Sequence, residues 1–270
     1  MVYFVVNLSS VTDNLSNRIN QRLLTAPVGA VLTMAWLEDR GISSGLANYY
    51  VSSGWLHRVG TGAFTTTSEP PTWLGAVFGL QQKIGCTIHP GGRTALDILG
   101  KGHFLSLGKQ TVYLFGDKGE RLPAWFQNLS LPNKLHYVGS HFLPPDVGLQ
   151  EYRPGTFTLK VSSLERAVLE FLYEQKIDEA GYEHMRLIFE SLGTLRGGLV
   201  QQLLECCSSV KVKRIFLHLA EPYQHPWLEE LDLKKIFLGS GKRVLFKGGK
   251  LDRKYLITVP ARDEKSSDGL

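Results

Sequence analysis

A regular succession of helix caps and glycine stops runs through residues 18–65 and narrows the folds open to this chain. Thr33 and Ser43 can each cap a helix with a side-chain oxygen, and Gly41 and Gly54 can each end one. The pattern predicts helices at 18–24, 34–40 and 43–53, then two extended runs, 55–59 and 63–65, around the tip Gly60-Thr61-Gly62. Three helices followed by a hairpin is the arrangement of a winged helix-turn-helix, which most often places a helix in the DNA major groove.

The third of these helices carries short polar side chains suited to reading bases. Asn can pair with an adenine edge through two hydrogen bonds, and Ser can reach bases or phosphates. We therefore expect Ser44, Asn48 and Tyr49 to face bases, while Arg58, beside the wing, faces phosphate. The full set of expected DNA contacts is Ser43, Ser44, Asn48, Tyr49, Ser52, His57, Arg58 and Thr61. The alternative is a winged helix that docks on protein, because this segment is not strongly basic.

The net charge of +5 is unevenly distributed along the chain. Residues 206–262 hold 12 Lys and Arg against five Asp and Glu, whereas basic and acidic residues balance in 1–205. This surplus predicts a second surface that meets an anion, either nucleic acid or an acidic face of a protein; the alternative is a solvated face without a partner. Its expected members are Lys211, Lys213, Arg214, Lys242, Arg243, Lys250, Arg253 and Lys254.

Composition and cysteine usage exclude several classes of protein. No stretch approaches the twenty or so apolar residues of a membrane span, so we expect no membrane partner. The opening run 1–6 is apolar but brief and lacks a basic leader, so we expect no signal peptide. Cys86, Cys206 and Cys207 are too few and too irregularly spaced for a disulfide framework or a zinc site. The adjacent pair indicates helix packing in a reduced cytoplasm.

The rest of the chain reads as a mixed segment followed by a mostly helical one. Residues 73–84 and 93–99 have helical spacing, and 111–115, 135–138 and 157–161 read as strands. Ser162 with Glu165 has the spacing of a capping box. Four helices are then expected at 163–175, 178–191, 196–207 and 210–219. Two extended runs close the chain, 243–246 and 255–259, with the basic tip of a hairpin at 247–254 between them.

The fold class expected is therefore α+β: an N-terminal winged helix-turn-helix, a mixed α/β segment, and a mostly helical C-terminal region that ends in a basic β-hairpin. The corresponding boundaries are 1–69, 70–160 and 161–262, with a disordered tail at 263–270.

Motifs for catalysis or cofactor binding are weak. Gly239-Ser240-Gly241-Lys242-Arg243 fails as a phosphate loop, because Ile236 stands where a glycine is needed and Arg243 where Ser or Thr is needed. The run 89–94 could hold an anion at a helix N-terminus through Arg93, or could be a glycine-rich turn fixed by packing, which we favour. The histidines lack metal-ligand spacing. We expect no cofactor, no metal and no catalytic residue.

At this point the sequence resembles the AbiEi antitoxins of type IV, AbiE-type abortive-infection toxin–antitoxin systems. The runs that carry the resemblance are 23–33, 36–37, 41–43, 53–56, 60–64, 89–96, 122–126, 209–217, 225–227, 238–243, 248–252, 254–255 and 258–260. Each run is short, but their order covers nearly the whole chain.

The resemblance implies two functions. The winged helix would repress the antitoxin–toxin operon by binding inverted repeats at its promoter, and the remainder would neutralise a cognate nucleotidyltransferase-like toxin, with or without a stable complex. Arg93 and His103 fit the family pattern, but no catalytic residue carries over. Two alternatives stay open: a transcriptional regulator without an antitoxin role, and an enzyme that covalently modifies the toxin.

Overall fold

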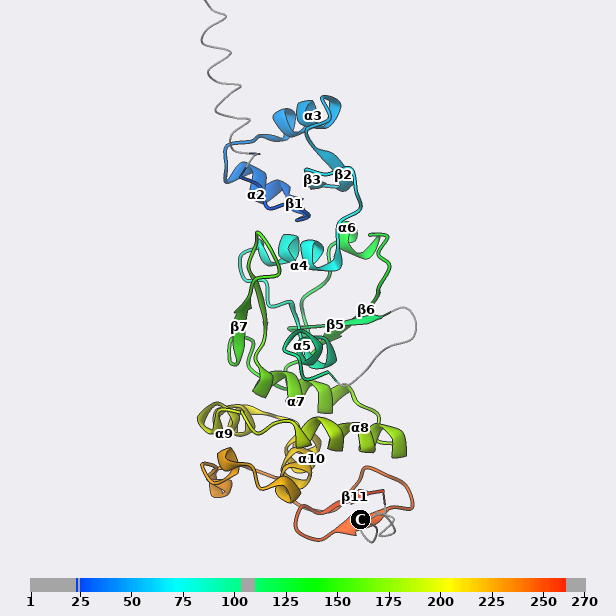
Figure 1. The fold of residues 1–270 in the computed structure, drawn as a ribbon, viewed down its shortest axis with the longest axis vertical. Helices are drawn as coiled ribbons and strands as arrows, with labels where there is room; N and C mark the ends of the chain where they lie inside the picture. Colours follow the sequence, from blue (N-terminus) through cyan, green and yellow to red (C-terminus); the bar gives the residue numbers. More distant parts are fainter. Residues whose placement is uncertain (1–22, 24, 103–109, 261–270) are drawn as a thin grey trace, which may run out of the picture. The chain divides into compact units, whose positions relative to one another are not determined.

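The computed structural model describes Leu23, residues 25–102 and residues 110–260, and its architecture mixes helices with several small sheets (Figure 1). The opening run 1–6, His103 and the tail 263–270 lie outside the described residues, as does the helix expected at 18–24 apart from Leu23.

The chain divides into two compact units, each assembled from separate stretches of sequence. Unit 1 comprises residues 1–86, 121–132 and 152–159, and unit 2 comprises 87–120, 133–151 and 160–270. Each of the three segments expected from the sequence is a continuous stretch of chain, whereas each of the two units combines three separate stretches.

Two capped helices begin the described part of unit 1, as expected. The elements are β1 (Leu32–Thr33), α2 (Met34–Glu38), α3 (Ser44–Ser52), β2 (His57–Gly60) and β3 (Ala63–Thr65). Thr33 Oγ1 accepts a hydrogen bond from the Trp36 amide at 3.3 Å, and Ser43 Oγ accepts one from the Leu46 amide at 3.3 Å. Gly41 and Gly54 follow the helices with φ angles of 74° and 79°, a backbone conformation that favours glycine.

The three strands form one antiparallel sheet in the order β1-β3-β2. Leu32 pairs with Phe64, and His57 pairs with Thr65, so the expected hairpin is confirmed. Gly62, with φ at 70°, allows the tight turn between β2 and β3. Strand β1 is only two residues long and was not expected, because so short a strand shows no alternation in the sequence.

Helix α4 (Trp73–Gln81) packs against the start of this region and is shorter than the expected 73–84. A Cβ atom on Gly75 would lie 1.9 Å from the carbonyl oxygen of Gly29, so glycine is required where the two backbones meet. The Val31 amide donates to the Gly75 carbonyl at 3.0 Å, and Phe78 packs on Phe157. The short helix α6 (Ala124–Gln127) also belongs to unit 1.

A small sheet in unit 2 has the order β4-β5-β6, formed by β4 (His89–Pro90), β5 (Thr111–Gly116) and β6 (Lys134–Gly139). Strands β5 and β6 are parallel, and β4 is antiparallel to β5. Helix α5 (Gly92–Ile98) follows β4. Strands β7 (Leu149–Tyr152) and β8 (Leu159–Ser162) form a separate two-stranded sheet. The strands expected at 111–115 and 135–138 are confirmed, while β4 and β7 were not expected.

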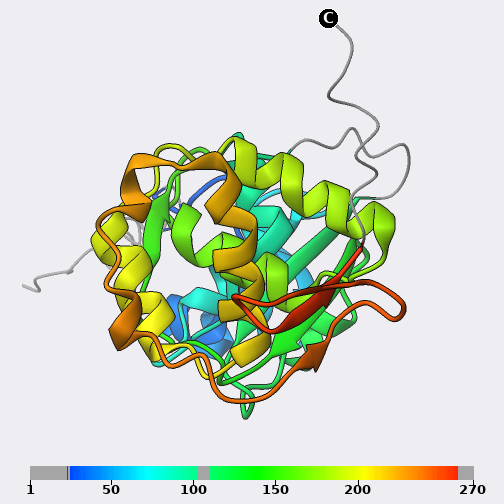
Figure 2. The same cartoon turned by 90° about the horizontal axis from the view of Figure 1, so that it is seen from below.

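The four helices expected after residue 162 are all present in unit 2 (Figure 2): α7 (Leu164–Glu174), α8 (Glu179–Glu190), α9 (Gly197–Cys206) and α10 (Val210–Ala220). Their apolar faces form one core that includes Leu169, Phe189, Phe216 and Trp227. The Trp227 indole donates to the Leu192 carbonyl at 2.7 Å. In the described parts of the chain, no helix combines the length and apolar character needed to cross a membrane.

The expected capping box is displaced by one residue. Ser163, not Ser162, caps α7 by accepting from the Arg166 amide at 3.5 Å. The hydroxyl of Ser162 instead donates to the Glu170 carboxylate at 2.7 Å, which places it in the interior of unit 2.

The C-terminal strands correct a second expectation. After three short 3-10 helices, Glu221–Tyr223, Pro226–Leu228 and Leu233–Lys235, come β9 (Arg243–Val244), β10 (Lys250–Asp252) and β11 (Ile257–Val259). The hairpin joins β10 to β11, whereas β9 runs parallel to β11. The runs 243–246 and 255–259 are therefore not the two arms of a hairpin. Asp252 fixes the actual turn, because its Oδ1 accepts from the amides of Lys254 and Tyr255 at 2.7 and 3.0 Å.

Candidate nucleic-acid interface and basic surface

Helix α3 presents a polar face to solvent beside the β2–β3 hairpin. Ala47 and Tyr50 point into the core of unit 1, while Ser44, Asn48 and Ser52 are exposed. Tyr49 lies on the same outer side with 64% of its surface exposed. An exposed tyrosine ring can stack on or pack against a partner.

Arg58 connects the hairpin to this helix. Its Nη2 donates a hydrogen bond to Asn48 Oδ1 at 2.8 Å, and its guanidinium carbon lies 5.2 Å from the centroid of the Phe64 ring. Both Arg58 and Asn48 are exposed. The bond therefore places a cation and an amide side by side on the outer surface of unit 1.

The remaining expected DNA contacts lie around this pair. Ser43 is exposed, but its hydroxyl caps the helix. Ser52 Oγ donates to the Tyr49 carbonyl at 2.8 Å. Thr61 is exposed at the turn of the hairpin, and His57 is half-buried in β2. The structure thus gathers these residues on one helix and one hairpin, and their contact with DNA stays a prediction.

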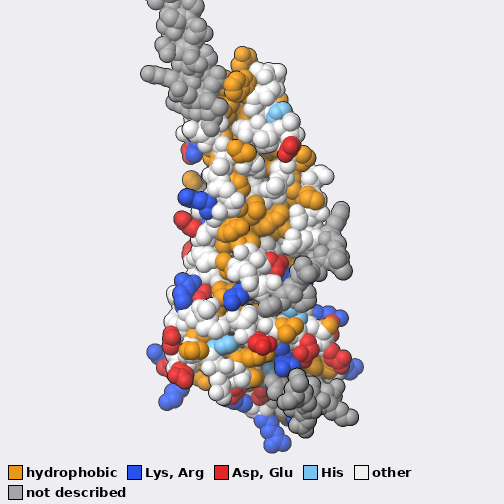
Figure 3. Space-filling view, in the orientation of Figure 1, with side chains coloured by type: hydrophobic (Ala, Val, Ile, Leu, Met, Phe, Trp, Pro, Cys, Tyr) orange, Lys and Arg blue, Asp and Glu red, His pale blue; other side chains and the backbone are white. Residues whose placement is uncertain are grey.

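Five of the residues expected on a basic surface are exposed near the C-terminus: Lys242, Arg243, Lys250, Arg253 and Lys254. We refer to these five as the basic C-terminal surface. Lys254 pairs with Glu221. Over the face shown in Figure 3, Lys and Arg side chains are sparse near α3 and more frequent over the C-terminal helices and strands. This agrees with the uneven distribution of charge in the sequence.

Arg214 does not belong to that surface, contrary to expectation. The residue is only 1% exposed, and its guanidinium donates to the carbonyls of Leu238, Gly239, Gly241 and Leu256 at 2.7 to 3.2 Å. Burial lowers the pKa of Arg214. Four of its five N–H donors hold the 238–241 turn and the turn before β11 against α10, and its burial removes it from contact with an external anion.

The sequence pattern also placed Lys213 on the surface, where it does not lie. Lys211 is only partly exposed. Lys213 is 3% exposed, with its ammonium 5.8 Å from the centroid of the Phe237 ring. Lys211 is half-buried and donates to the Tyr173 carbonyl at 3.4 Å, and burial lowers its pKa. Helix α10 is covered on almost every side, because all residues from Val212 to Leu217 are buried. Lys213 and Arg214 on this helix are therefore buried, and Lys211 is half-buried.

Arg93 lies among side chains of α7 and β5. It donates to Gln175 Oε1 at 3.2 Å, and its guanidinium carbon is 5.9 Å from the centroid of the Tyr113 ring. The run 89–94 is not merely a turn, since His89 and Pro90 form β4 and Gly92 begins α5.

A buried network centred on Glu170 was missed by sequence reasoning. Glu170 is fully buried, and its carboxylate accepts hydrogen bonds from the Gly92 amide, Ser162 Oγ, His89 Nε2 and Arg166 Nε at 2.7 to 3.0 Å. Burial alone would raise the pKa of Glu170, but His89, Arg166 and Ser162 outweigh it and lower the pKa to about 2. A buried carboxylate with four donors fixes α7 against β4, α5 and β8.

The one local signal for this network was the spacing of Arg166 and Glu170 on a single helix face. Among the residues that the structure describes, no three or more His, Cys, Asp or Glu side chains form a group that could hold a metal ion.

Comparison with known proteins assigns the chain to a family. The family model described as "Transcriptional regulator, AbiEi antitoxin N-terminal domain" matches residues 15–107. The model described as "Transcriptional regulator, AbiEi antitoxin, Type IV TA system" matches residues 109–260. No curated protein matches the chain significantly. Among solved structures, the crystal structure of the RV2827C protein from Mycobacterium tuberculosis is similar in fold, with a TM-score of 0.55 and 14% identity over 90% of each chain. The two matching models cover more than nine tenths of the sequence, and the chain belongs to the AbiEi antitoxin family of type IV toxin–antitoxin transcriptional regulators.

Proposed function

We propose that residues 32–65, together with the helix expected at 18–24, form a winged helix that binds the promoter of the protein's own operon and represses it in the cytoplasm. The observation that carries this proposal is the exposed polar face of α3 beside the β2–β3 hairpin, joined to it by the Arg58–Asn48 hydrogen bond. The element order β1, α2, α3, β2, β3 and the sheet order β1-β3-β2 support it.

In this proposal α3 lies in the major groove and the β2–β3 turn lies beside the phosphate backbone. Ser44, Asn48 and Tyr49 face the bases, and Thr61 at the turn is placed to meet a phosphate. Promoter inverted repeats would then be read by two copies of the chain, one on each half-site, because a half-site accommodates one recognition helix.

The experiment is a mobility-shift titration of the full chain on the DNA upstream of its own gene. Asn48→Ala combined with Tyr49→Ala should weaken binding at least tenfold, and the fold should survive because both side chains are exposed. The matched control replaces Leu187 and Glu190, an apolar and an acidic residue of α8, and should bind like the wild type. If the winged helix instead docks on protein, the chain will show no salt-dependent binding to this DNA.

We also propose that the chain neutralises a nucleotidyltransferase-like toxin and that the basic C-terminal surface takes part. The support is the exposure of its five cations and the concentration of the chain's positive excess in 206–262. An exposed cationic surface accelerates encounter with an acidic face of a protein or with the RNA on which a toxin acts.

Covalent modification of the toxin is a rival mechanism with a distinct readout. Intact-mass measurement of the toxin after co-expression with the full chain separates the two. An unchanged mass supports neutralisation by binding or by competition, and an added mass that requires this chain supports an enzymatic antitoxin.

A further inference from the structure

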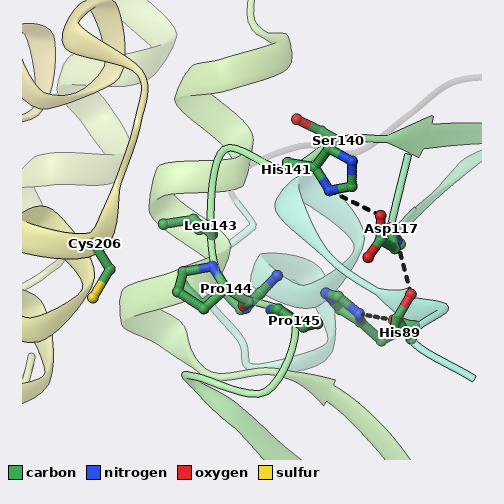
Figure 4. Close-up of a pocket in the computed structure, with 11 residues that line it drawn as sticks. His89, Asp117, Ser140, His141, Leu143, Pro144, Pro145 and Cys206 are labelled. Carbon is green, nitrogen blue, oxygen red and sulfur yellow. Dashed lines mark hydrogen bonds and ion pairs between the residues drawn. The ribbon is translucent and has the colours of Figure 1, made fainter. Parts of the chain in front are cut away.

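A cavity of about 200 Å³ in unit 2 is unexplained by either proposed function (Figure 4). Liquid water occupies roughly 30 Å³ per molecule, so the cavity has room for a small ligand. Asp117 and His141 lie together on one side of it, and Cys206 lies on the other, beyond Pro144 and Pro145. The other lining residues are Thr87, His89, Gly116, Ser140, Leu143 and Arg166.

Two residues of the cavity wall, His89 and Arg166, are hydrogen-bonded to the buried Glu170 carboxylate. His89 Nδ1 lies 2.7 Å from the Thr87 carbonyl oxygen, which can only accept, so Nδ1 is a donor. His89 Nε2 lies 3.0 Å from the Glu170 carboxylate. Both ring nitrogens of His89 are therefore engaged inside the protein, and Arg166 supplies the guanidinium of the cavity wall.

One nitrogen of Arg166 has no hydrogen-bond acceptor among the residues that the structure describes. Its Nε donates to Glu170 at 2.7 Å, and its Nη1 donates to the carbonyls of Pro144 and Val147 at 2.6 and 2.7 Å. Its Nη2 makes no hydrogen bond with any residue in the described part of the chain, although the side chain is only 5% exposed. Because Nη2 is not fully enclosed by protein, it can donate to water or to a ligand in the cavity that Arg166 lines.

The rest of the lining restricts the kind of ligand. Asp117 already has a partner at the rim, because its Oδ1 lies 2.8 Å from His141 Nδ1. Leu143, Pro144 and Pro145 supply an apolar wall. A cation would be repelled by the Arg166 guanidinium, and a purely apolar molecule would displace water from Nη2 without replacing its hydrogen bond.

We propose that this cavity binds a small molecule through an oxyanion, a carboxylate or a phosphate, whose oxygen accepts hydrogen bonds from Arg166 Nη2. The contact completes the donors of Arg166 in the way that buried arginines commonly pair with planar or tetrahedral anions. The same side chain holds the 144–147 loop through Nη1, so occupancy stabilises that loop and unit 2 with it.

Cys206 provides a reporter at the site. It is exposed and lines the cavity, whereas Cys207 is buried and its burial raises the pKa of that thiol to about 11. In a full-length Cys86→Ala protein, the rate of alkylation by iodoacetamide therefore reports on Cys206. The probes are inorganic phosphate, adenosine monophosphate and succinate, each compared with sodium chloride at equal ionic strength.

We expect at least one probe to slow alkylation fivefold or more and to raise the melting temperature. Phosphate and the monophosphate acting without succinate would identify a phosphate site, and succinate acting without them would identify a carboxylate site. Arg166→Gln should remove the protection. Because that variant also breaks the buried network, a second pair is needed: Cys206→Asp should lose the thermal shift, and the isosteric, neutral Cys206→Asn should keep it. The proposal is overturned if no probe protects Cys206, or if Cys206→Asp and Cys206→Asn respond alike.

Discussion

The hydrogen bond from Arg58 Nη2 to Asn48 Oδ1, at 2.8 Å, limits the base contacts that Asn48 would make in the proposed complex with DNA. Adenine recognition by asparagine needs the amide oxygen as acceptor and the amide nitrogen as donor. In the free protein one of the two lone pairs of that oxygen already accepts from Arg58. The pair therefore offers more donors than acceptors, which suits the acceptor pattern of guanine or the phosphate backbone.

Asn48→Ala and Arg58→Ala should each weaken promoter binding by about 1–3 kcal/mol. The double variant should cost less than the sum of the two, because either single change already disrupts the shared bond. Fluorescence anisotropy on a labelled promoter duplex, at three salt concentrations, measures all four proteins. Strict additivity would show that the two side chains act independently on DNA.

Reversal of two exposed charges tests the basic C-terminal surface. Lys242→Glu with Arg243→Glu should abolish rescue of cells that express the toxin, because the attraction that speeds encounter becomes repulsion. The control is Lys118→Glu with Lys134→Glu, which makes the same change in net charge on exposed lysines elsewhere in unit 2. Both proteins should melt close to the wild type. Equal rescue by the two charge-reversed proteins would show that the basic C-terminal surface is exposed to solvent without a role in neutralisation.

Local signals explain why most helices were predictable from sequence. The caps Thr33, Ser43 and Asp178 stand beside the helices they start, and the helical spacing of apolar residues spans several turns within each helix. The two-residue strands β1 and β4 have no such signal, because their pairing partners lie more than twenty residues away. The parallel pairing of β9 with β11 likewise depends on contacts that sequence alternation does not encode.

The candidate sites divide in the same way. The outer face of α3 follows from local spacing, but the bond between Asn48 and Arg58 needs the hairpin to fold back toward the helix. Charge counting located the C-terminal surplus correctly and misassigned Lys213 and Arg214, because a count does not say which side of a helix faces solvent. The Glu170 network joins residues from 89 to 170, and no short motif contains it.

The low pKa of Glu170 predicts a loss of stability in acid. A carboxyl whose pKa is lower in the folded protein contributes stability that is present above its ordinary value of 4.5 and is lost as the pH falls toward about 2. Glu165 has the same direction: burial opposes ionisation, but its bonds with Arg196 prevail and lower the pKa to about 2. Urea midpoints should therefore fall steeply between pH 4.5 and 2.

Glu170→Gln should flatten that dependence as well as lower the midpoint at neutral pH. The neutral amide cannot gain a proton in the same range, so one source of the pH slope is removed. Glu229→Gln, a change at an exposed residue without an ion pair in the described structure, serves as the control and should follow the wild-type curve. A wild-type slope in Glu170→Gln would show that other groups govern the acid transition.

The stability of an Arg214 variant, compared with that of a variant at an exposed lysine, distinguishes a structural cation from a surface cation. Arg214→Gln should lower the free energy of unfolding by about 3–5 kcal/mol, because four carbonyl acceptors lose a buried cationic partner. Lys250→Gln, at an exposed position, should change it by less than about 0.5 kcal/mol. Chemical denaturation measures both. At low temperature, where more of the Arg214→Gln protein is folded, the folded fraction should bind promoter DNA with wild-type affinity. If Arg214→Gln is folded, has wild-type stability and fails to neutralise the toxin, then Arg214 takes part in anion binding and is not only structural.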